Sequence, residues 1–489
     1  MTTGVLALDQ GTTSSKALLI DPVTLSVLGA ASRPVAIGSP RLGWVEQDAA
    51  ELWESVRAAA EQVLVEHPEV ELAGIAISNQ RESVTAWDRN GLPLGPVVSW
   101  QDQRGAELCS RLTSAETIER VQARTGLELT AMYSASKLRW LIDAMGDLSG
   151  VRLGTIDAWL LDRLTGGAVY AIEAGNASRT LLFDLAGLDW DDEMCALFEV
   201  PRELLPQVRR SAGPWGVTRG VPGIPDGVPI LAVLGDSHAA LYGHWALAPE
   251  HSNTGKATYG TGSSVMLPAQ GADARRAGVS TTLAWWLDAP LWAHEANILY
   301  SGGGLDWLAT LLGVSGGREL SELGAGAGDS GTAVFVPALN GLGAPWWEPA
   351  AVGTLTGLAA GTTRAQVAWA GLESVAHQIC DVVDVMDPDR QQGTLHAGGG
   401  ATTSDLLMQL QADLLGRDLL VSTVADISPL GAGALAARGL GILPRPSTPG
   451  RRFTPSEDFT VERRAEQRHR WRTALERAGV RPSTSRTAN

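Results

Sequence analysis

Residues 5–20 read VLALDQGTTSSKALLI, and two apolar runs around a polar turn predict a strand, a tight turn and a second strand. Five residues of the turn, GTTSS at 11–15, recur with one change as GTGSS at 260–264. The offset is 260 − 11 = 249 residues, about half of the 489-residue chain. A chance match in a chain rich in Gly, Thr and Ser is the alternative, but the place of each copy at the start of a half favours a duplicated domain.

Strands and helices alternate in both halves of the sequence. Apolar runs of strand length precede the glycine clusters at 302–304 and 398–400, and helical periodicity follows each cluster. Further helices are expected over 49–65 and about 364–386. The alternation predicts an α/β protein with mixed sheets flanked by helices.

We place the boundary between the halves near residue 245. The predicted division is an N-terminal domain of residues 1–245, a C-terminal domain of residues 246–445 and a C-terminal extension of residues 446–489. The end of that extension, from about residue 481, is rich in Thr, Ser and Arg, so we expect it to be poorly ordered.

The composition excludes several classes of protein. Apolar residues make up 44% and charged residues 19% of the chain, which suffices for sizeable cores. The formal net charge of −16 is a poor match for nucleic acid or an anionic membrane. No apolar run approaches a membrane span, the N-terminus carries no basic leader, and three widely spaced cysteines form neither a disulfide framework nor a zinc motif. We expect a cytoplasmic protein that acts on a small molecule.

Two turns rich in Gly, Thr and Ser, one in each half, can direct backbone N–H groups and hydroxyls into one cleft. Such groups bind phosphate oxygens, and glycine lets the backbone approach the ligand closely. Ordinary tight hairpins are the alternative for either turn alone, but the pair, together with the glycines at 398–400, favours phosphate binding. The P-loop motif is absent, as is a GxGxxG turn after the first strand, so a nucleotide needs a different cradle.

Two aspartates follow strands and can take part in phosphoryl transfer. Asp9 ends the first strand, where it could orient Mg²⁺ beside the phosphates or simply form the turn. Asp236 lies in VLGDSHAA (233–240), where it could accept the proton of an attacking alcohol or cap the helix that starts at Ser237. His238, beside an apolar helix, is expected to be structural.

Arg81 and Glu82 are adjacent charges after a strand that is expected to be interior. They could face water, or they could supply the donors and acceptors that a short polyol requires. The chain has 17 tryptophans, three of which lie in predicted loops and could stack on the C–H faces of a carbohydrate. These are Trp100, Trp346 and Trp347.

Taken in order, eight segments of the sequence resemble the FGGY family of carbohydrate kinases, and within it the glycerol kinases most closely. The resemblance extends over about residues 4–440. The segments are LALDQGTTSS (6–15), GWVEQD (43–48), NQRE (79–82), WQDQR (100–104), SASKLRW (134–140), NASRT (176–180), KATYGTG (256–262) and GLGAPWW (341–347).

The resemblance implies two actin-like, ribonuclease-H-like domains that close over ATP and substrate in an interdomain cleft. It implies that Asp236 is the catalytic base and that Arg81 and Glu82 grip a polyol. From their places in the sequence we expect Asp9 and Asp236 to hold Mg²⁺ and Trp100 to contact the substrate. Members of the family are often homodimers or homotetramers. The ATP contacts that it implies are Thr12, Thr13, Ser14 and Lys16 in the first half, and Gly260, Thr261, Gly302, Gly400 and Ser404 in the second.

The sequence departs from the glycerol kinases at positions that contact the substrate or the adenine. The substrate-contacting Tyr of those enzymes falls on Met132, with Tyr133 beside it, and Ser237 stands where they have Gln. Near the adenine, Gln and Asn positions of the family become Asp306 and Ser404. Fewer polar polyol contacts leave both glycerol and a somewhat larger tetritol or pentitol as candidate substrates.

Two other functions stay open at this point. One is a kinase for a ketose such as xylulose or ribulose, although xylulose kinases tend to carry Met-His where this chain has Arg81 and Glu82. The other is a catalytically silent actin-like module that binds a nucleotide, against which the joint presence of these two residues with Asp9 and Asp236 argues. We expect an ATP-dependent kinase that uses Mg²⁺ and phosphorylates a terminal hydroxyl of a small polyol.

Overall fold

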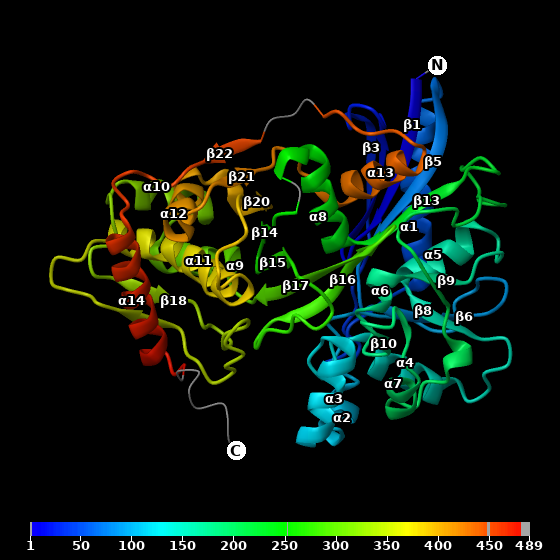
Figure 1. Ribbon diagram of the computed structural model, residues 1–489, viewed down its shortest axis with the longest axis horizontal. Coiled ribbons are helices and arrows are strands. Elements are labelled where there is room, and N and C mark those ends of the chain that lie inside the picture. The colour runs from blue at the N-terminus through cyan, green and yellow to red at the C-terminus, as the bar shows by residue number, and fades with distance from the viewer. Residues whose placement is uncertain (1, 252, 447–449, 481–489) are drawn as a thin grey trace.

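A five-stranded sheet in the order β13-β5-β1-β2-β3 forms the centre of the first half (Figure 1). The computed structural model describes residues 2–251, 253–446 and 450–480, and it confirms the strand, turn and strand predicted at the start of the chain. β1 pairs antiparallel with β2, and β2 with β3, whereas β1, β5 and β13 run parallel. The bounds are β1 Thr2–Gln10, β2 Ser14–Ile20, β3 Val27–Pro34, β5 Val70–Asn79 and β13 Ile230–Gly235.

The second half repeats this topology in a seven-stranded sheet, in the order β16-β17-β15-β14-β20-β21-β22. β14 and β15 form an antiparallel hairpin, β15 continues antiparallel to β17, and β14, β20 and β21 run parallel. The five central strands of each sheet therefore share one pattern of order and direction, which confirms the predicted two-domain α/β fold. The bounds are β14 Lys256–Tyr259, β15 Ser263–Pro268, β16 Ser280–Trp286, β17 Pro290–Ile298, β20 Leu395–Gly398, β21 Leu419–Val421 and β22 Arg451–Phe453.

Helices cover both faces of the first sheet. α1 (Ala49–Glu66) starts at the N-cap Asp48, whose side chain accepts from the backbone N–H of Glu51, and packs on β2 and β3. α13 (Ile427–Gly439) packs against β1, β5 and β13, although it comes from the far end of the second half; Figure 1 shows it in orange beside the blue strands. α13 also crosses α8 (Asp236–Leu247) so closely that a Cβ on Gly431 would lie 1.9 Å from the carbonyl oxygen of Ala239. The crossing therefore requires glycine at this position.

The remainder of the first half surrounds a four-stranded sheet in the order β4-β7-β6-β8. Its strands are β4 Glu46–Gln47, β6 Val84–Trp87, β7 Val97–Val98 and β8 Arg152–Thr155. Its helices are α2 Ala106–Arg111, α3 Ala115–Thr125, α4 Ser134–Met145, α5 Ile156–Leu164, α6 Ala174–Ala177 and α7 Asp192–Leu197. Two short pairs complete it, β9 Ala171–Glu173 with β12 Gln207–Arg209 and β10 Phe183–Asp184 with β11 Asp189–Trp190.

In the second half, the long α11 packs against α9, α10 and α12 and forms the centre of the helical layer. Its N-cap, Thr363, forms a capping box with Gln366, and the helix ends at Met386, as the periodicity predicts. The bounds are α9 Gly302–Leu312, α10 Gly317–Ala325, α11 Arg364–Met386, α12 Asp405–Leu415 and α14 Val461–Arg477, with the strand pair β18 Val334–Val336 and β19 Thr354–Thr356.

The segment predicted as a C-terminal extension belongs structurally to the second half. β22 pairs with β21 at the edge of the second sheet, and α14 packs on β18 with Trp471 fully buried. The predicted poorly ordered tail from residue 481 lies outside the described residues. Within the described ranges, no helix is long and apolar enough to cross a membrane.

Candidate active site

Three parallel strands end at one edge of the first sheet and bring Asp9 and Asp236 into one region. Asp9 lies beside Ser78 near the ends of β1 and β5, and Gly235, just before Asp236, lies beside Asn79. Loops beyond the carboxyl ends of parallel strands are the usual ligand site of such sheets. The chain after β5 then carries Arg81 toward Asp236.

Asp236 is the first residue of α8, and its carboxylate has two defined partners. Nε of Arg81 donates to its Oδ1 at 3.2 Å, and the backbone N–H of Ser237 donates to the same oxygen at 2.6 Å. The N-cap of α8 is Gly235, so the alternative in which Asp236 caps the helix is not what the structure shows. Burial raises the pKa of Asp236 above its ordinary value and Arg81 opposes the rise, while 42% of the side chain stays exposed. The group can therefore accept a proton from a bound molecule.

Asp9 is suited to a divalent cation. Its Oδ1 is buried and has no hydrogen-bond partner within the described part of the chain. Burial raises the pKa of Asp9 to about 6, with a further contribution from the charge of Asp236, and the Ser78 side chain opposes the rise. A hard cation such as Mg²⁺ would satisfy this oxygen. The described residues contain no group of three or more His, Cys, Asp or Glu side chains that could hold a metal ion.

The first turn is held rigidly by its neighbours. The amide of Gln47 donates to the carbonyl oxygen of Thr12 at 2.7 Å, and Nε1 of Trp100 donates to Thr12 Oγ1 at 3.1 Å. Thr12 and Thr13 lie on this turn and Ser14 begins β2; Thr13 is exposed, and Thr12 and Ser14 are partly exposed. Lys16, also predicted to contact ATP, pairs with Asp426 at the N-cap of α13 at 2.6 Å. The Trp100 indole thus braces the turn.

A cavity of about 880 Å³ in the second half brings together the nucleotide contacts predicted there. The backbone N–H of Gly302 donates to the Gly260 carbonyl at 2.9 Å, and a Cβ on Gly302 would lie 2.6 Å from that oxygen, so glycine is required where the two loops meet. α10 contributes Arg318, Ser321 and Glu322, which no sequence motif marked. The predicted residues that line the cavity are Gly260, Thr261, Gly302, Asp306, Gly400 and Ser404.

Ser404 has a structural contact that explains its place in this cavity. It is the N-cap of α12, where its Oγ accepts from the backbone N–H of Leu407 at 3.1 Å. The same Oγ lies 2.7 Å from Ser321 Oγ on α10. The two hydroxyls join α10 to α12 across the cavity wall.

Arg81 and Glu82 are almost fully buried, and each pairs with a residue that the sequence reasoning did not place in the site. Arg81 donates from Nη1 and Nη2 to the two carboxylate oxygens of Glu295 at 2.8 and 2.6 Å. Glu82 accepts from Nε of Arg179 at 2.6 Å, and Arg179 lies 3.0 Å from Glu295. Glu82 has a φ of 63°, a left-handed backbone conformation that costs on the order of 1–3 kcal/mol and occurs at ligand sites.

Arg179 and Glu295 were not predicted as site residues for two different reasons. Arg179 lies in NASRT (176–180), one of the segments that carry the family resemblance. The sequence therefore marked the residue, but it did not indicate that Arg179 pairs with Glu82. Glu295 lies within strand β17, where one carboxylate among apolar residues carries no motif. The pairing of Glu295 with Arg81 became apparent only from the structure, in which β17 packs against the first half.

Met132 and Tyr133 lie in the loop before α4, and the structure separates their environments. Met132 is partly exposed, whereas Tyr133 is buried, with its Oη 3.1 Å from Ser280 Oγ and its ring under the guanidinium of Arg179. Nζ of Lys137, which is fully buried, donates to the carbonyl oxygens of Ala131 and Met132. Ser237 follows Asp236 directly and is partly exposed.

The other two tryptophans proposed for carbohydrate stacking contact residues of the second half. Nε1 of Trp346 donates to Asp381 at 3.1 Å, and the ring packs on the cluster that contains Trp471. Nε1 of Trp347 donates to the Gly278 carbonyl at 2.8 Å. His238 is buried, and its Nε2 lies 3.3 Å from Nη1 of Arg81, behind Asp236. This agrees with the structural role expected for it.

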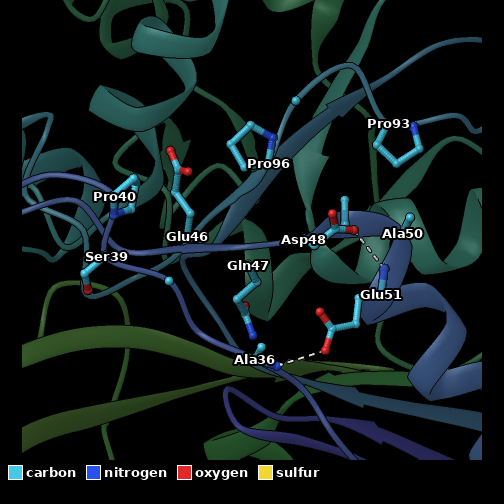
Figure 2. Close-up of a pocket in the computed structure, with 13 residues that line it drawn as sticks. Ala36, Ser39, Pro40, Glu46, Gln47, Asp48, Ala50, Glu51, Pro93 and Pro96 are labelled. Atoms are coloured by element: carbon cyan, nitrogen blue, oxygen red, sulfur yellow. Dashed lines mark hydrogen bonds between the residues drawn. The ribbon is translucent and has the colours of Figure 1, made fainter.

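A second cavity, of about 780 Å³, opens at the start of α1, and Figure 2 shows its lining. Three acidic side chains line it, but each has a structural contact. Asp48 accepts from the Glu51 backbone N–H at 2.9 Å, Glu51 accepts from the Ala36 backbone N–H at 3.2 Å, and Glu46 pairs with Arg104 at 2.6 Å. Gln47 at its floor is the residue that holds Thr12. These contacts shape the loop beside the turn that follows β1.

Comparison with known proteins identifies the family. Residues 4–243 match the N-terminal domain of the FGGY family of carbohydrate kinases, and residues 255–440 match the C-terminal domain. The chain is 39% identical to an apulose kinase of Pectobacterium atrosepticum, over 98% of this chain and 99% of the relative. It is 40% identical to a glycerol kinase of Citrifermentans bemidjiense, over 96% of this chain and 98% of the relative.

A solved structure supports the same assignment. A glycerol kinase of Plasmodium falciparum with ADP superposes with a TM-score of 0.91 at 27% identity, over 98% of this chain and 99% of that one. The predicted actin-like fold and the predicted phosphotransferase activity toward a hydroxyl acceptor are confirmed. The chain belongs to the FGGY family of carbohydrate kinases.

Proposed function

We propose that the protein transfers the γ-phosphoryl group of ATP to a terminal hydroxyl of a small polyol, glycerol or a related tetritol or pentitol. The observation that carries the proposal is the Asp236 carboxylate, which is oriented by Arg81 and still has 42% of its side chain exposed. The glycine cradle around Gly260 and Gly302 would hold the nucleotide, and Asp9 and Asp236 would hold Mg²⁺ beside its phosphates.

The chemistry then follows from these positions. Asp236 accepts the proton of the acceptor hydroxyl while the hydroxyl oxygen bonds to the γ-phosphorus. The bond from that phosphorus to the β–γ bridging oxygen breaks, and ADP leaves. Arg81 lowers the pKa of the carboxylate against the effect of burial and fixes its direction. Mg²⁺, when bound, neutralises charge on the phosphate oxygens.

Two residue differences from the glycerol kinases support a substrate somewhat larger than glycerol. Met132 replaces a phenol with an apolar chain, and Ser237 replaces an amide with a short hydroxyl. Tyr133 does not restore the missing phenol, because its hydroxyl is bound to Ser280 and its ring lies under Arg179. Both replacements are smaller or less polar, so they leave room and remove two contacts that would select glycerol.

A sugar acceptor is the second candidate, and one comparison favours it. The relative from Pectobacterium atrosepticum, an apulose kinase, is 39% identical over nearly the full length of both chains. A ketose such as apulose, xylulose or ribulose therefore belongs in any test of specificity. A ketose differs from the matching polyol at one carbon, which is a carbonyl in the ketose and an alcohol carbon in the polyol.

The test is a substrate panel assayed with ATP and Mg²⁺ by coupled detection of ADP. We expect the highest kcat/KM for a tetritol or pentitol, measurable activity with glycerol, and lower values for the ketoses. A ketose that exceeds every polyol contradicts the proposal and supports the second candidate. The double variant Met132→Tyr, Ser237→Gln is expected to shift the ratio of kcat/KM toward glycerol, by about 10-fold or more if each restored hydrogen bond contributes ~1 kcal/mol.

The assembly and the location form part of the proposal as well. A homodimer or homotetramer would agree with the resemblance. A cytoplasmic location would agree with the net charge of −16, which is a poor match for an anionic membrane. Light scattering on the purified protein measures the mass of the particle and decides between a monomer of 51.4 kDa and a multiple of it.

A further inference from the structure

Glu295 links the two halves of the protein at the acceptor site. It lies on β17 of the second sheet with 2% of its surface exposed, and its carboxylate meets the guanidinium of Arg81, from the first half, through two parallel hydrogen bonds of 2.8 and 2.6 Å. A bidentate pair of this kind fixes both the place and the plane of the guanidinium. The third donor of Arg81, Nε, is then directed at Asp236.

The contact belongs to a row of alternating charges that ends at the exposed carboxylate. The order is Asp236, Arg81, Glu295, Arg179 and Glu82, and neighbours lie 3.2, 2.6, 3.0 and 2.6 Å apart. Glu295 is the central anion, between two guanidinium groups that would otherwise repel each other. Although burial alone would raise the pKa of Glu295, Arg179 and Arg81 hold that pKa well below its ordinary range, so it stays ionised.

A stability role alone does not account for this arrangement. Buried ion pairs often contribute no more to stability than well-packed apolar residues would, because desolvation offsets the attraction. The pair does fix the orientation of the Arg81 guanidinium. Within the described residues, its two terminal nitrogens contact Glu295 and, from Nη1, His238 at 3.3 Å. Without the Glu295 carboxylate, the terminal nitrogens of Arg81 would be free to turn toward Asp236.

We infer that Glu295 is a positioning residue, which holds Arg81 from the opposite half and thereby sets the direction of the Asp236 carboxylate toward the acceptor hydroxyl. The acceptor site is then complete only while β17 of the second half is seated against the first half. This inference rests on the proposed function, because the acceptor and the proton transfer are those proposed above.

The test is a double-mutant cycle with Glu295→Gln and Arg81→Lys, read as kcat/KM for the best acceptor of the panel. Glu295→Gln keeps the shape of the side chain and removes its charge, and we expect a loss of about 100-fold, the scale that follows from displacing a catalytic group by ~1 Å. In the Arg81→Lys background the same change should cost less than about threefold, since Glu295 acts through Arg81. ADP affinity, measured by calorimetry without acceptor, should stay within about twofold of the wild type because the nucleotide cavity is untouched.

Glu373→Gln is the matched control. Glu373 is also a buried glutamate of the second half, on α11, where it accepts from Trp369 at 2.8 Å outside the site. Its substitution should lower thermal stability without changing the acceptor KM relative to the ATP KM. If Glu295→Gln does not fold, Glu295→Asp, which keeps the charge but cannot span both nitrogens in the same place, should lose acceptor kcat/KM while ADP affinity is retained.

The outcomes separate this inference from the proposed function. A wild-type enzyme that phosphorylates no acceptor overturns both. An active wild type in which Glu295→Gln changes kcat/KM by less than about threefold, or in which the losses from Glu295→Gln and Arg81→Lys simply multiply, overturns the positioning role alone. A parallel loss of ADP affinity, acceptor turnover and melting temperature shows a purely structural role and overturns it as well.

Discussion

Arg81 and Asp236 are 155 residues apart in the sequence, yet Nε of the arginine lies 3.2 Å from Oδ1 of the aspartate. The contact forms because parallel β5 and β13 end at the same edge of the sheet, one followed by the loop with Arg81 and the other by α8 with Asp236. Arg81 shares its charge with Glu295, so it orients the Asp236 carboxylate without neutralising it completely. The arrangement gives a carboxylate that is fixed in direction and partly exposed.

Asp236→Asn tests the base. An amide cannot accept the hydroxyl proton, so kcat is expected to fall by roughly 10²–10⁴-fold, with ADP affinity in EDTA nearly unchanged. Turnover with the best acceptor and calorimetry with ADP are the two measurements. Asp389→Asn, at an exposed position of the second half, is the control and should keep wild-type turnover. Near-normal kcat in Asp236→Asn would show that another group takes the proton.

The acid side of the pH profile gives an independent check on the same carboxylate. Burial raises the pKa of Asp236, and the base must be ionised to act. The rate is therefore expected to rise with pH through a midpoint above the ordinary value of 3.8. A profile that is flat down to that value would contradict the assignment.

Asp9→Asn tests the proposed cation contact. The amide keeps the size of the side chain but loses the charge that a divalent ion requires. ADP affinity in the presence of Mg²⁺ should fall by about 10-fold or more, whereas ADP affinity in EDTA should not change. Calorimetry under the two conditions measures both values. Equal losses with and without the metal would show that Asp9 serves the fold of the turn only.

Lys137→Met tests the loop that carries Met132. The substitution leaves the carbonyl oxygens of Ala131 and Met132 without their buried donor, which should lower the free energy of unfolding by ~1–3 kcal/mol. Because Met132 is proposed to contact the acceptor, the KM for the acceptor should rise while the KM for ATP stays constant. Arg139→Met, which removes a partly exposed cation of the same helix, is the control. A change confined to thermal stability would separate the loop from substrate binding.

Glu173→Gln tests how the stability of the first half depends on pH between pH 5 and pH 8. Burial raises the pKa of Glu173 from 4.5 to about 8, against hydrogen bonds from Ser211 and the backbone that lower it. Between these values the carboxyl of the unfolded chain has lost its proton, whereas that of the folded chain keeps it. The free energy of unfolding therefore falls as the pH rises from about 4.5 to about 8. The loss is ~1.4 kcal/mol for each unit by which the folded and unfolded pKa values differ. The variant should lose less stability than the wild type between pH 5 and pH 8 in denaturant titrations. Glu71→Gln, at an exposed site, should follow the wild type.

Much of the fold was predictable because it is encoded locally. The apolar runs on both sides of GTTSS and GTGSS define antiparallel hairpins, and the structure forms them as β1 with β2 and β14 with β15. Periodicity alone placed α11 over residues 364–386. The place of α13 was not predictable in this way, because an apolar helix of small residues can cover either sheet, and the close approach at Gly431 is set by α8.

The sequence by itself determined the two glycine turns, the aspartates that follow strands and the segments that mark the family, since each depends on residue type and short spacing. Only the tertiary structure decided how the charges pair. Arg81 lies next to Glu82 in the chain, yet its closest charged partner is Glu295, which is 214 residues away, while Glu82 pairs with Arg179. Adjacent side chains at a sharp turn point in different directions, and a buried charge is stable only beside a partner that packing supplies from another element.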